Sequence, residues 1–550
     1  MSRRAIAVLT LLLTTSAFAG GQVTASKAAL STASPYATKA GLSVLKNGGN
    51  AIDAAVAVAF VLAVAHPQAG NLGGGGFLTY YDAPTKGVWT LDFREVAPYA
   101  ATREMFAQAK GEARTGARAV AVPGTIAGLE AMHGKFGSRP WKELLAPAIS
   151  LARDGIRVDA ELSGDLTTAQ MTRKIDPPPF FTEGKAAAAG ATLAQPELAL
   201  TIQRLAEAGP RDFYDGALAT KLVEGLRTLG GTIGFRDLRE YKPVWRAPIQ
   251  LRFGNYDLYT VAPPSGGGLV MGTTLNILHG YDLAKSGFQT PKTVHLLIEA
   301  QRRAYLDRNK YLGDPVGTRI PYRELLSAER AALWRKSIDP TRATPTLVLT
   351  EPGSVVPEGE HTTHFTIVDA EGNIAAVTTS LGDDFGSGVI VPGLGFFLNG
   401  AMDDFTIAPA TPTRDALLQG NTNVIEPGKR AASSMAPTII LRDGKPFLAL
   451  GTKGGPSIPN TILQVFLNVA VYKKSLQEAV AAPRWHHQGL PEDAAYERTL
   501  VKPALIETLN GMGHGVAARE AIGDVHAILI DKGRITAVAD PRRGGAAGGY

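Results

Sequence analysis

Cysteine is absent from all 550 residues of the chain. Its absence excludes disulfides, thiolate metal sites, iron–sulfur clusters and cysteine nucleophiles. If the protein is exported, its fold must therefore be held together by its core alone, and a chain of this length can bury a large one.

Charge is also sparse. Asp, Glu, Lys and Arg make up 19% of the residues, and the net charge is only +6. No block of lysine and arginine stands out, so nothing in the sequence indicates a nucleic-acid partner. The hydrophobic fraction of 45% is ordinary for a globular protein. The length predicts either several domains or one large enzyme fold.

Apolar runs of membrane-spanning length are missing as well. The run from Ala54 to Ala65 is about a dozen residues, which suits a buried helix. At the N-terminus, Arg3 and Arg4 precede a short apolar run that ends in Ala17-Phe18-Ala19. This pattern is typical of a secretory signal peptide, residues 1–19, with an uncleaved anchor as the alternative. We therefore expect an exported protein, periplasmic or secreted, with no stable membrane anchor.

The most informative segment that is present begins at Thr362. A proline- and glycine-rich stretch ends at His361, and a β-patterned run follows directly. A threonine inside a chain is a poor nucleophile because its hydroxyl has no base beside it. Cutting the bond before Thr362 would create an α-amine, with a pKa of about 7.7–8, next to that hydroxyl. The pattern predicts either an N-terminal threonine nucleophile or an ordinary junction between a loop and a strand.

The two strands after this junction predict a partner for Thr362. Residues 369–373 are typical of a turn and separate the strands 362–368 and 374–380. A hairpin symmetric about Glu371 places Ser380 opposite Thr362, with Cβ atoms about 4.5–5.5 Å apart. An even-numbered loop would shift this register by one residue, and two solvent-facing hydroxyls are the alternative interpretation.

Other motifs suggest the remaining parts of an amide-cleaving site. The pair Gly454-Gly455 follows a strand and can direct two N–H groups at an oxyanion, although a simple turn is the alternative. Arg94, also after a strand, can hold a substrate carboxylate. Asp403-Asp404 can bind a substrate ammonium group or cap a helix.

Two further motifs are given plainer interpretations. The run Gly73 to Gly76 lacks the Lys-Ser/Thr of a phosphate loop, so we expect close backbone packing. His364, His486 and His487 have no carboxylate at metal-ligand spacing, so we expect neither a metal nor another cofactor.

Hydrophobic periodicity predicts a layered α+β sandwich without internal repeats. Asn50 is expected to cap a helix. The predicted helices are 37–46, 51–65, 293–306, 462–472 and 476–481, within a mostly helical region from 123 to about 300 that 237–241 interrupts. The predicted strands are 77–81, 89–93, 251–261, 362–368, 374–380, 438–441, 447–450, 526–530 and 535–539.

Ordered motifs over nearly the whole mature chain resemble those of one family. They are Gly48-Gly49-Asn50-Ala51-Ile52-Asp53-Ala54-Ala55, Gly73-Gly74-Gly75-Gly76-Phe77, Asp92-Phe93-Arg94-Glu95, Pro123-Gly124-Thr125, Tyr311-Leu312-Gly313-Asp314-Pro315, Thr362-Thr363-His364, Met402-Asp403-Asp404-Phe405, Ser433-Ser434-Met435, Gly454-Gly455, Pro483-Arg484-Trp485-His486-His487-Gln488 and Asp540-Pro541-Arg542. The set is similar to that of the γ-glutamyltransferase family (γ-glutamyltranspeptidase, glutathione hydrolase) of N-terminal-nucleophile hydrolases. The resemblance implies a four-layer αββα sandwich, made as a proenzyme that cuts itself into a large subunit, 20–361, and a small catalytic subunit, 362–550.

The same resemblance implies the catalytic roles. Thr362 would attack the preceding carbonyl during maturation and the substrate γ-carbonyl afterwards. Ser380 stands where many members carry a threonine near the nucleophile's amine. The backbone N–H groups of Gly454 and Gly455 would stabilise the oxyanion.

It also implies how the substrate is held. Arg94, which we expect to contact only substrate, would bind the glutamyl α-carboxylate with help from Ser433 and Ser434. Asp404 would bind the α-ammonium group. The implied partners are a small γ-glutamyl peptide and an acceptor, which is water, an amino acid or a peptide.

Three positions depart from the family pattern. Gly382 falls where an asparagine is common in bacterial members, and Ala401 where a glutamine is common. Asp415 replaces the usual tyrosine of a covering loop, 409–420, so the tyrosine–asparagine latch cannot form. We expect a weaker grip on the substrate's amino end and a looser lid.

Three functions remain open on the sequence. The first is a γ-glutamyl hydrolase or transferase acting on glutathione-like peptides. The second is an acylase with the same nucleophile that cleaves glutaryl or cephalosporin-type side-chain amides. The third is a binding protein that has kept the fold without catalysis.

Overall fold

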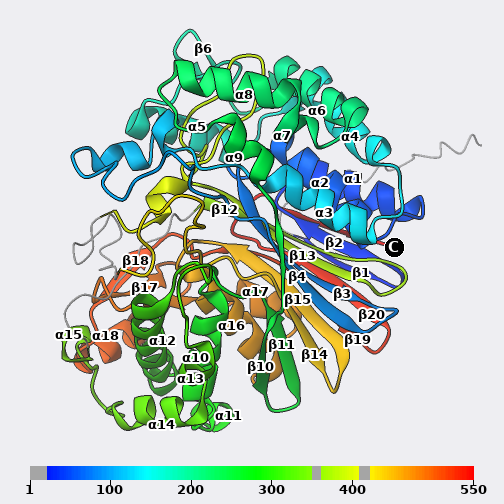
Figure 1. Ribbon diagram of the computed structural model, residues 1–550. Helices are drawn as coiled ribbons and strands as arrows, with labels where there is room; N and C mark the ends of the chain where they lie inside the picture. Colours follow the sequence, from blue (N-terminus) through cyan, green and yellow to red (C-terminus); the bar gives the residue numbers. More distant parts are fainter. Residues whose placement is uncertain (1–20, 350–360, 408–420) are drawn as a thin grey trace, which may run out of the picture.

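The computed structural model describes residues 21–349, 361–407 and 421–550. Its centre is a pair of stacked antiparallel sheets (Figure 1). The first sheet has the order β21 (Ala546–Gly549), β2 (Ala29–Thr32), β12 (His361–Val368), β13 (Ile374–Gly382), β3 (Gly75–Asp82), β4 (Gly87–Asp92) and β9 (Val244–Arg246). The second has the order β1 (Gln22–Ala25), β20 (Arg534–Ala539), β19 (Asp524–Asp531), β15 (Lys445–Lys453), β14 (Thr438–Arg442), β11 (Tyr256–Thr260) and β10 (Ile249–Phe253).

Helices cover the outer face of each sheet (Figure 1). On the side of the first sheet lie α1 (Pro35–Lys46), α2 (Ala51–Ala65), α3 (Thr125–Phe136), α4 (Trp141–Asp154), α5 (Ala160–Arg173), α6 (Pro196–Ala208), α7 (Asp212–Asp215), α8 (Ala217–Thr228) and α9 (Phe235–Glu240). On the side of the second lie α10 (Gly267–Leu278), α11 (Leu283–Ser286), α12 (Pro291–Tyr311), α13 (Tyr322–Leu325), α14 (Ala328–Lys336), α15 (Thr346–Leu349), α16 (Ser457–Ala470), α17 (Leu476–Ala481) and α18 (Pro503–Gly511). The predicted αββα order is therefore confirmed.

Smaller elements join these layers. Short strands form two ribbons and a three-stranded sheet: β5 (Ile156–Arg157) with β8 (Thr192–Leu193), β6 (Phe181–Thr182) with β7 (Lys185–Ala186), and β16 (Trp485–His486), β17 (Ala494–Glu497) and β18 (Val516–Arg519). Single 3-10 turns cover Lys110–Ala113, Ala117–Ala119 and Ala401–Asp404.

Helix α2 anchors the first sheet to its helical layer. All 15 of its residues are buried, as its almost entirely apolar sequence predicts. Asn50 caps it by accepting hydrogen bonds from the N–H groups of Ile52 and Asp53, both at 3.0 Å. The N–H of Ala51 donates to the carboxylate of Asp369, in the turn between β12 and β13, at 2.9 Å. The helix start thus fixes the hairpin that carries Thr362.

The two faces of β12 differ because side chains alternate along a strand. Phe365 and Ile367 pack into the core under the helices. Val368 belongs to a separate cluster between the sheets, with Ala449 of β15 and Ile528 of β19. Thr362, His364 and Thr366 share the face of Val368, so the inter-sheet space changes from apolar to polar as it approaches Thr362.

Two predicted elements are wrong. The alternating run 251–261 is a hairpin of β10 and β11, in which Phe253 pairs with Tyr256. Gly254 turns the chain with a φ of +60°, and the alternation hides this because it continues through the turn. Residues 237–241 do not interrupt the helical region, because α9 covers most of them.

The glycine run packs closely, as predicted. A Cβ on Gly74 would lie 2.2 Å from the carbonyl oxygen of Ser380, and one on Gly76 would lie 2.2 Å from that of Thr378. Among the described ranges, no helix combines the length and apolarity needed to cross a membrane. The predicted signal peptide lies outside these ranges.

Candidate active site

Thr362 lies near the start of β12, an inner strand of the first sheet, directly opposite Ser380 of β13. The predicted register is therefore confirmed. The pairing shifts between His361 and Thr362, because His361 pairs with Gly382 and Leu381 is left over as a bulge. Bulges bend a strand and redirect its side chains, and they are frequent beside active sites. The irregularity falls on the bond that the sequence predicts to be cut.

The hydroxyl of Ser380 is held in place by its own strand end. The N–H of Gly382 donates to Ser380 Oγ at 2.9 Å. Thr362 and Ser380 pair across the two strands and are only 2% and 5% exposed, so both side chains lie in a largely water-free space. A hydroxyl in this position can orient the Thr362 hydroxyl or the amine that chain cleavage would create.

His364 continues this polar face between the sheets. Thr366 Oγ1 donates to the carbonyl of His526 at 3.0 Å, so it accepts from His364 Nε2 at 2.9 Å. His364 Nδ1 is then left to accept from Thr378 Oγ1 at 2.8 Å. Burial lowers the pKa of His364 well below its ordinary value, so the ring is neutral. His364 is thus a satisfied neutral group beneath the nucleophile.

The glycine pair directly follows β15, a strand of the second sheet that packs against β12. A Cβ on Gly451 would meet the His364 ring, at 2.4 Å. Thr362 lies two residues before His364, and β15 ends at Lys453, two residues after Gly451, so we expect Thr362 to lie near the turn that Gly454 and Gly455 form. Neither N–H donates a hydrogen bond to another described residue. The turn also leads into α16, whose N-terminus favours negative charge, so the N–H groups suit an oxyanion.

Arg94 is fixed by two carboxylates. Its Nη1 lies 2.6 Å from Glu95 Oε2, and its Nη2 contacts Asp404 Oδ2. All three side chains are nearly inaccessible to water. Burial raises the pKa of Glu95, although the adjacent Arg94 opposes the shift. The expectation that Arg94 contacts only substrate is therefore wrong, because the guanidinium is also the counter-ion of two buried acids.

Ser433 and Ser434 come shortly before β14, which lies next to β15 in the second sheet. Ser433 Oγ accepts from the N–H of Met435 at 3.1 Å, and its carbonyl accepts from Gly266 N at 2.6 Å. Ser434 is 1% exposed, and its hydroxyl has no hydrogen-bond partner among the described residues. A buried hydroxyl without a partner costs free energy that a bound carboxylate would recover.

Two of the three departures from the family pattern are neighbours. A Cβ on Gly382 would lie 3.3 Å from the backbone of Gly400 and 3.5 Å from the nitrogen of Ala401. The polar side chains common at positions 382 and 401 are thus missing from one spot beside Thr362. Asp415 lies outside the described residues.

The candidate histidines do not come together. His364 lies between the sheets, whereas His486 accepts from Asn460 and contacts Gln488, both at 2.8 Å. His487 Nε2 donates to the carbonyl of Glu492 at 3.0 Å. Throughout the described part of the chain, no three His, Cys, Asp or Glu side chains are grouped to hold a metal ion.

Comparison with known proteins agrees with this arrangement. The family model described as Gamma-glutamyltranspeptidase matches residues 37–550. The chain is 39% identical over 517 residues to the glutathione hydrolase proenzyme of Escherichia coli (strain K12), covering 92% of this chain and 89% of that protein. This chain belongs to the gamma-glutamyltranspeptidase family. It is an enzyme of that family, so the predicted family and enzyme class are confirmed.

Solved structures support the fold of a gamma-glutamyltranspeptidase. A cephalosporin acylase from Bacillus halodurans superposes with a TM-score of 0.85 at 28% identity, over 96% of this chain and 97% of that chain. A gamma-glutamyltranspeptidase chain from Pseudomonas nitroreducens, complexed with L-DON, gives 0.53 at 38% identity, over 56% of this chain and 94% of its own. The fold is that of the N-terminal-nucleophile hydrolases.

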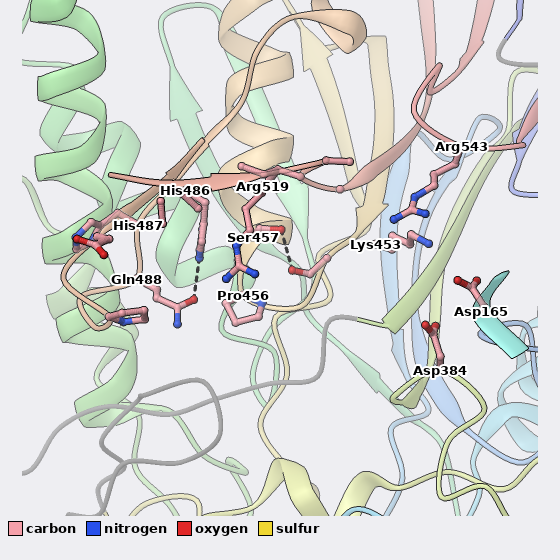
Figure 2. A pocket seen from close by; sticks show the side chains of 18 residues that line it. Asp165, Asp384, Lys453, Pro456, Ser457, His486, His487, Gln488, Arg519 and Arg543 are labelled. Carbon is pink, nitrogen blue, oxygen red and sulfur yellow. Dashed lines mark hydrogen bonds between the residues drawn. The ribbon is translucent and has the colours of Figure 1, made fainter. Parts of the chain in front are cut away.

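A pocket of about 340 Å3 lies beside Gly454, and no motif in the sequence predicts it. Figure 2 shows two groups of side chains in it. Arg519, Ser457, Pro456, His486 and Gln488 line one part, and Lys453, Arg543, Asp165 and Asp384 line the other. These residues come from distant parts of the sequence, so no local motif signals the pocket.

Proposed function

We propose that this protein is a γ-glutamyl hydrolase and transferase, and that Thr362 is its nucleophile. The observation that carries the proposal is a row of residues at the ends of neighbouring strands in the first sheet. Thr362 pairs with Ser380, Ser380 pairs with Gly75, and a Cβ on Gly75 would lie 2.7 Å from Glu95, the partner of Arg94. A continuous series of neighbouring residues thus connects the nucleophile Thr362, through Ser380, to Arg94.

The proposed maturation uses the same hydroxyl. Thr362 Oγ1 attacks the carbonyl carbon of His361, the C–N bond breaks, and an ester with a free Thr362 amine forms. Water then hydrolyses the ester, leaving a carboxylate on His361. The bulge at this bond supports the proposal, because it disturbs the ladder where the peptide must bend. The products are the large subunit 20–361 and the small subunit 362–550, as the proenzyme name of the Escherichia coli relative suggests.

The proposed substrate contacts follow from charge. A γ-glutamyl group carries an α-carboxylate and an α-ammonium group, and the site holds a buried Arg94–Asp404 pair. The substrate can exchange this pair for two new ones, carboxylate on Arg94 and ammonium on Asp404, without leaving a buried charge alone. Three strand spacings separate β4 from β12, about 14 Å. An arginine side chain and a glutamyl group together bridge that distance.

The proposed turnover has two steps. The Thr362 hydroxyl, with its α-amine as base, attacks the γ-carbonyl, and the N–H groups of Gly454 and Gly455 stabilise the oxyanion. The amine leaves, and a γ-glutamyl ester on Thr362 remains. Water or another amine then takes the acyl group. Glutathione is the substrate class that the names of the relatives suggest.

A side-chain amide acylase is the second candidate. The lack of polar side chains at Gly382 and Ala401 favours it, and so does the similarity to a cephalosporin acylase. A glutaryl group has no ammonium, however, and would add a negative charge beside Asp404 and Glu95. We therefore favour γ-glutamyl substrates. Rates on γ-glutamyl and glutaryl anilides measure this directly, and faster glutaryl turnover would reject the first function in favour of the acylase.

We also propose export. The support is the N-terminal sequence alone, where residues 1–19 carry the signal-peptide pattern. Fractionation of cells that make the protein tests it. Processed protein that stays inside the cytoplasmic membrane would count against export.

A further inference from the structure

Lys453 is the last residue of β15, directly before the glycine pair, and it faces the space between the two sheets. Ala449 of the same strand belongs to the apolar cluster between the sheets. Side chains alternate along a strand, so Lys453, four residues later, lies on the same face. Asp524 of β19 is its cross-strand partner and shares that face. Thr362 faces the same space from the first sheet.

The course of β12 brings its start over β15. Thr366 Oγ1 donates to a backbone carbonyl of β19 at 3.0 Å. Two residues nearer the start of β12, the ring of His364 lies against Gly451 of β15, where a Cβ would meet it at 2.4 Å. The strand thus passes from β19 to β15 as it approaches Thr362. We therefore expect Thr362 to lie near Lys453, which follows Gly451 by two residues.

The ammonium group of Lys453 is held by acids. Its Nζ lies 3.4 Å from Glu161 Oε1, and only 13% of its side chain is exposed. Burial alone would raise the pKa of Asp524, but the neighbouring His526 and Lys453 lower it, so this carboxylate is ionised. Lys453 is thus a cation whose position is restricted by two anions and which is largely shielded from water.

Other titratable groups lie around Lys453, and Figure 2 shows several of them. They are Asp165 of α5, Asp384 after β13, Arg543 before β21, and the buried histidines His66, His364 and His526. Burial lowers the pKa of His66 and of His364, so neither adds a charge. Arg543 is two strands away from β12. Of the two cations, Lys453 is therefore the one on the strand that β12 crosses.

The charges on the other side of Thr362 are already matched. There, Arg94 contacts both Glu95 and Asp404. The proposed base between the two sides is the α-amine that chain cleavage gives to Thr362. Such an amine ordinarily has a pKa of about 7.7–8, so most of it carries a proton at neutral pH and cannot accept another. A fixed charge of the same sign nearby disfavours that proton.

We propose that Lys453 is a positioning residue of the reaction, whose ammonium group keeps the α-amine of Thr362 unprotonated near neutral pH. The inference rests on the proposed function and adds to it the residue that activates the base. As Thr362 Oγ1 forms its bond to the γ-carbonyl carbon, the hydroxyl proton passes to the α-amine. When the C–N bond of the substrate breaks, the same proton passes to the departing amine. Lys453 takes part in neither bond and acts through the α-amine.

The pH dependence of hydrolysis tests the proposal. Matured protein is given γ-glutamyl-p-nitroanilide without an acceptor, and kcat/KM is measured from about pH 5 to about pH 9.5. In Lys453→Gln we expect the acid limb of the profile to move up by about one pH unit. At pH 6, kcat/KM should then fall about tenfold, whereas at pH 9 it should stay near the wild-type value. A purely structural defect would lower kcat/KM alike at every pH.

Two variants serve as controls. Lys453→Arg keeps the charge and should keep the wild-type acid limb. Arg543→Gln removes the other cation beside Glu161, because Arg543 Nη1 lies 3.5 Å from the same oxygen. Arg543 is remote from β12, so its loss should leave the acid limb in place. The α-amine arises only on cleavage, so denaturing gels should show complete chain cleavage in every variant. Melting temperatures report folding separately, and Lys453→Met is a second neutral variant.

Three results would overturn the inference while leaving the proposed function intact. One is an acid limb at the wild-type pH in both Lys453→Gln and Lys453→Met. Another is an acid limb that moves as far in Lys453→Arg as in Lys453→Gln. The third is a Lys453→Gln chain that folds but stays uncut, because Lys453 would then act before the amine exists. A matured wild-type protein that hydrolyses no γ-glutamyl anilide would overturn the proposed function, and this inference with it.

Discussion

The two sides of Thr362 are built in opposite ways. On one side, Arg94 is 2% exposed, and its charge is already matched by Glu95 and Asp404. On the other side, the pocket is open, and two cations, Lys453 and Arg543, lie beside the same carboxylate of Glu161.

This difference indicates how the two sides divide their roles. A buried site whose charges are already paired accepts only a ligand that supplies a new partner for each of these charges, because a lone buried charge is costly. A fixed cation on the open side instead acts on the protonation of a neighbouring amine. We therefore expect the closed side to govern the choice of the acyl group and the open side to govern the pH dependence of the rate.

Thr362 separates the two sides, and its replacement has the largest expected effect. Thr362→Ala removes the hydroxyl that both proposed reactions need, so we expect an uncut chain with activity at least about a thousandfold lower. Denaturing gels and anilide hydrolysis measure the two outcomes. Thr362→Ser, which keeps the hydroxyl, should retain both reactions at a reduced rate. Cleavage or turnover in Thr362→Ala would show that another group is the nucleophile.

The closed side is tested by Arg94→Lys. Lysine keeps a cation for Glu95 and Asp404 but loses the two-pronged geometry. We expect chain cleavage to continue and KM for the γ-glutamyl anilide to rise about tenfold or more, with a smaller change in kcat. Arg94→Ala is the less informative change, because it leaves two buried acids without a partner and costs about 3–5 kcal/mol of stability. An unchanged KM in Arg94→Lys would remove Arg94 from the substrate site.

Ser380 stands at the boundary between the sides. Ser380→Ala removes the hydroxyl opposite Thr362, and we expect chain cleavage and turnover to slow about tenfold, the effect of one hydrogen bond of about 1.4 kcal/mol. Ser380→Thr is the matched control, because it preserves the hydroxyl. Time courses of cleavage separate the two variants. Equal rates in Ser380→Ala and the wild type would reduce Ser380 to a structural residue.

The open side gives a smaller, pH-dependent effect. Burial, with the charges of Asp384 and Glu161 adding, raises the pKa of Asp165 to about 7, while Lys453 and Arg543 oppose the shift. In the unfolded chain, the carboxyl group of Asp165 has an ordinary pKa of about 3.9. The stabilisation from the bound proton is therefore complete below about pH 4 and is lost as the pH rises through about 7.

Replacing Asp165 with asparagine removes the destabilisation that the charged carboxylate causes at high pH. At pH 8 we expect Asp165→Asn to melt about 1–3 °C above the wild type, and at pH 5 the difference should shrink. Calorimetry at both values measures it. Asp493→Asn changes an exposed residue of the same pocket and should have no such effect. A difference that is the same at pH 5 and pH 8 would contradict the assigned titration.

Local patterns predicted much of the fold and the centre of the site. The almost entirely apolar run after Asn50 predicted both ends of α2 correctly, because the cap and the apolar run are both local signals. The odd-numbered turn fixed Ser380 opposite Thr362. Helix α16 was predicted from 462 but begins at Ser457, because Pro459 is tolerated in the first helical turn.

What the sequence could not predict depends on contacts between distant segments. Glu95 is next to Arg94 in the chain, but only the folded site shows that it shares the guanidinium with Asp404. The pocket joins Asp165 of α5 to Arg519 of β18, from opposite halves of the chain. No spacing rule brings such residues together, because their proximity is set by the stacking of two sheets.

The most direct measurement is N-terminal sequencing of the fragments of purified, active protein. We predict two polypeptides, the smaller beginning Thr362-Thr363-His364-Phe365. Full activity in material that remains one unbroken chain across His361 and Thr362 would contradict the account.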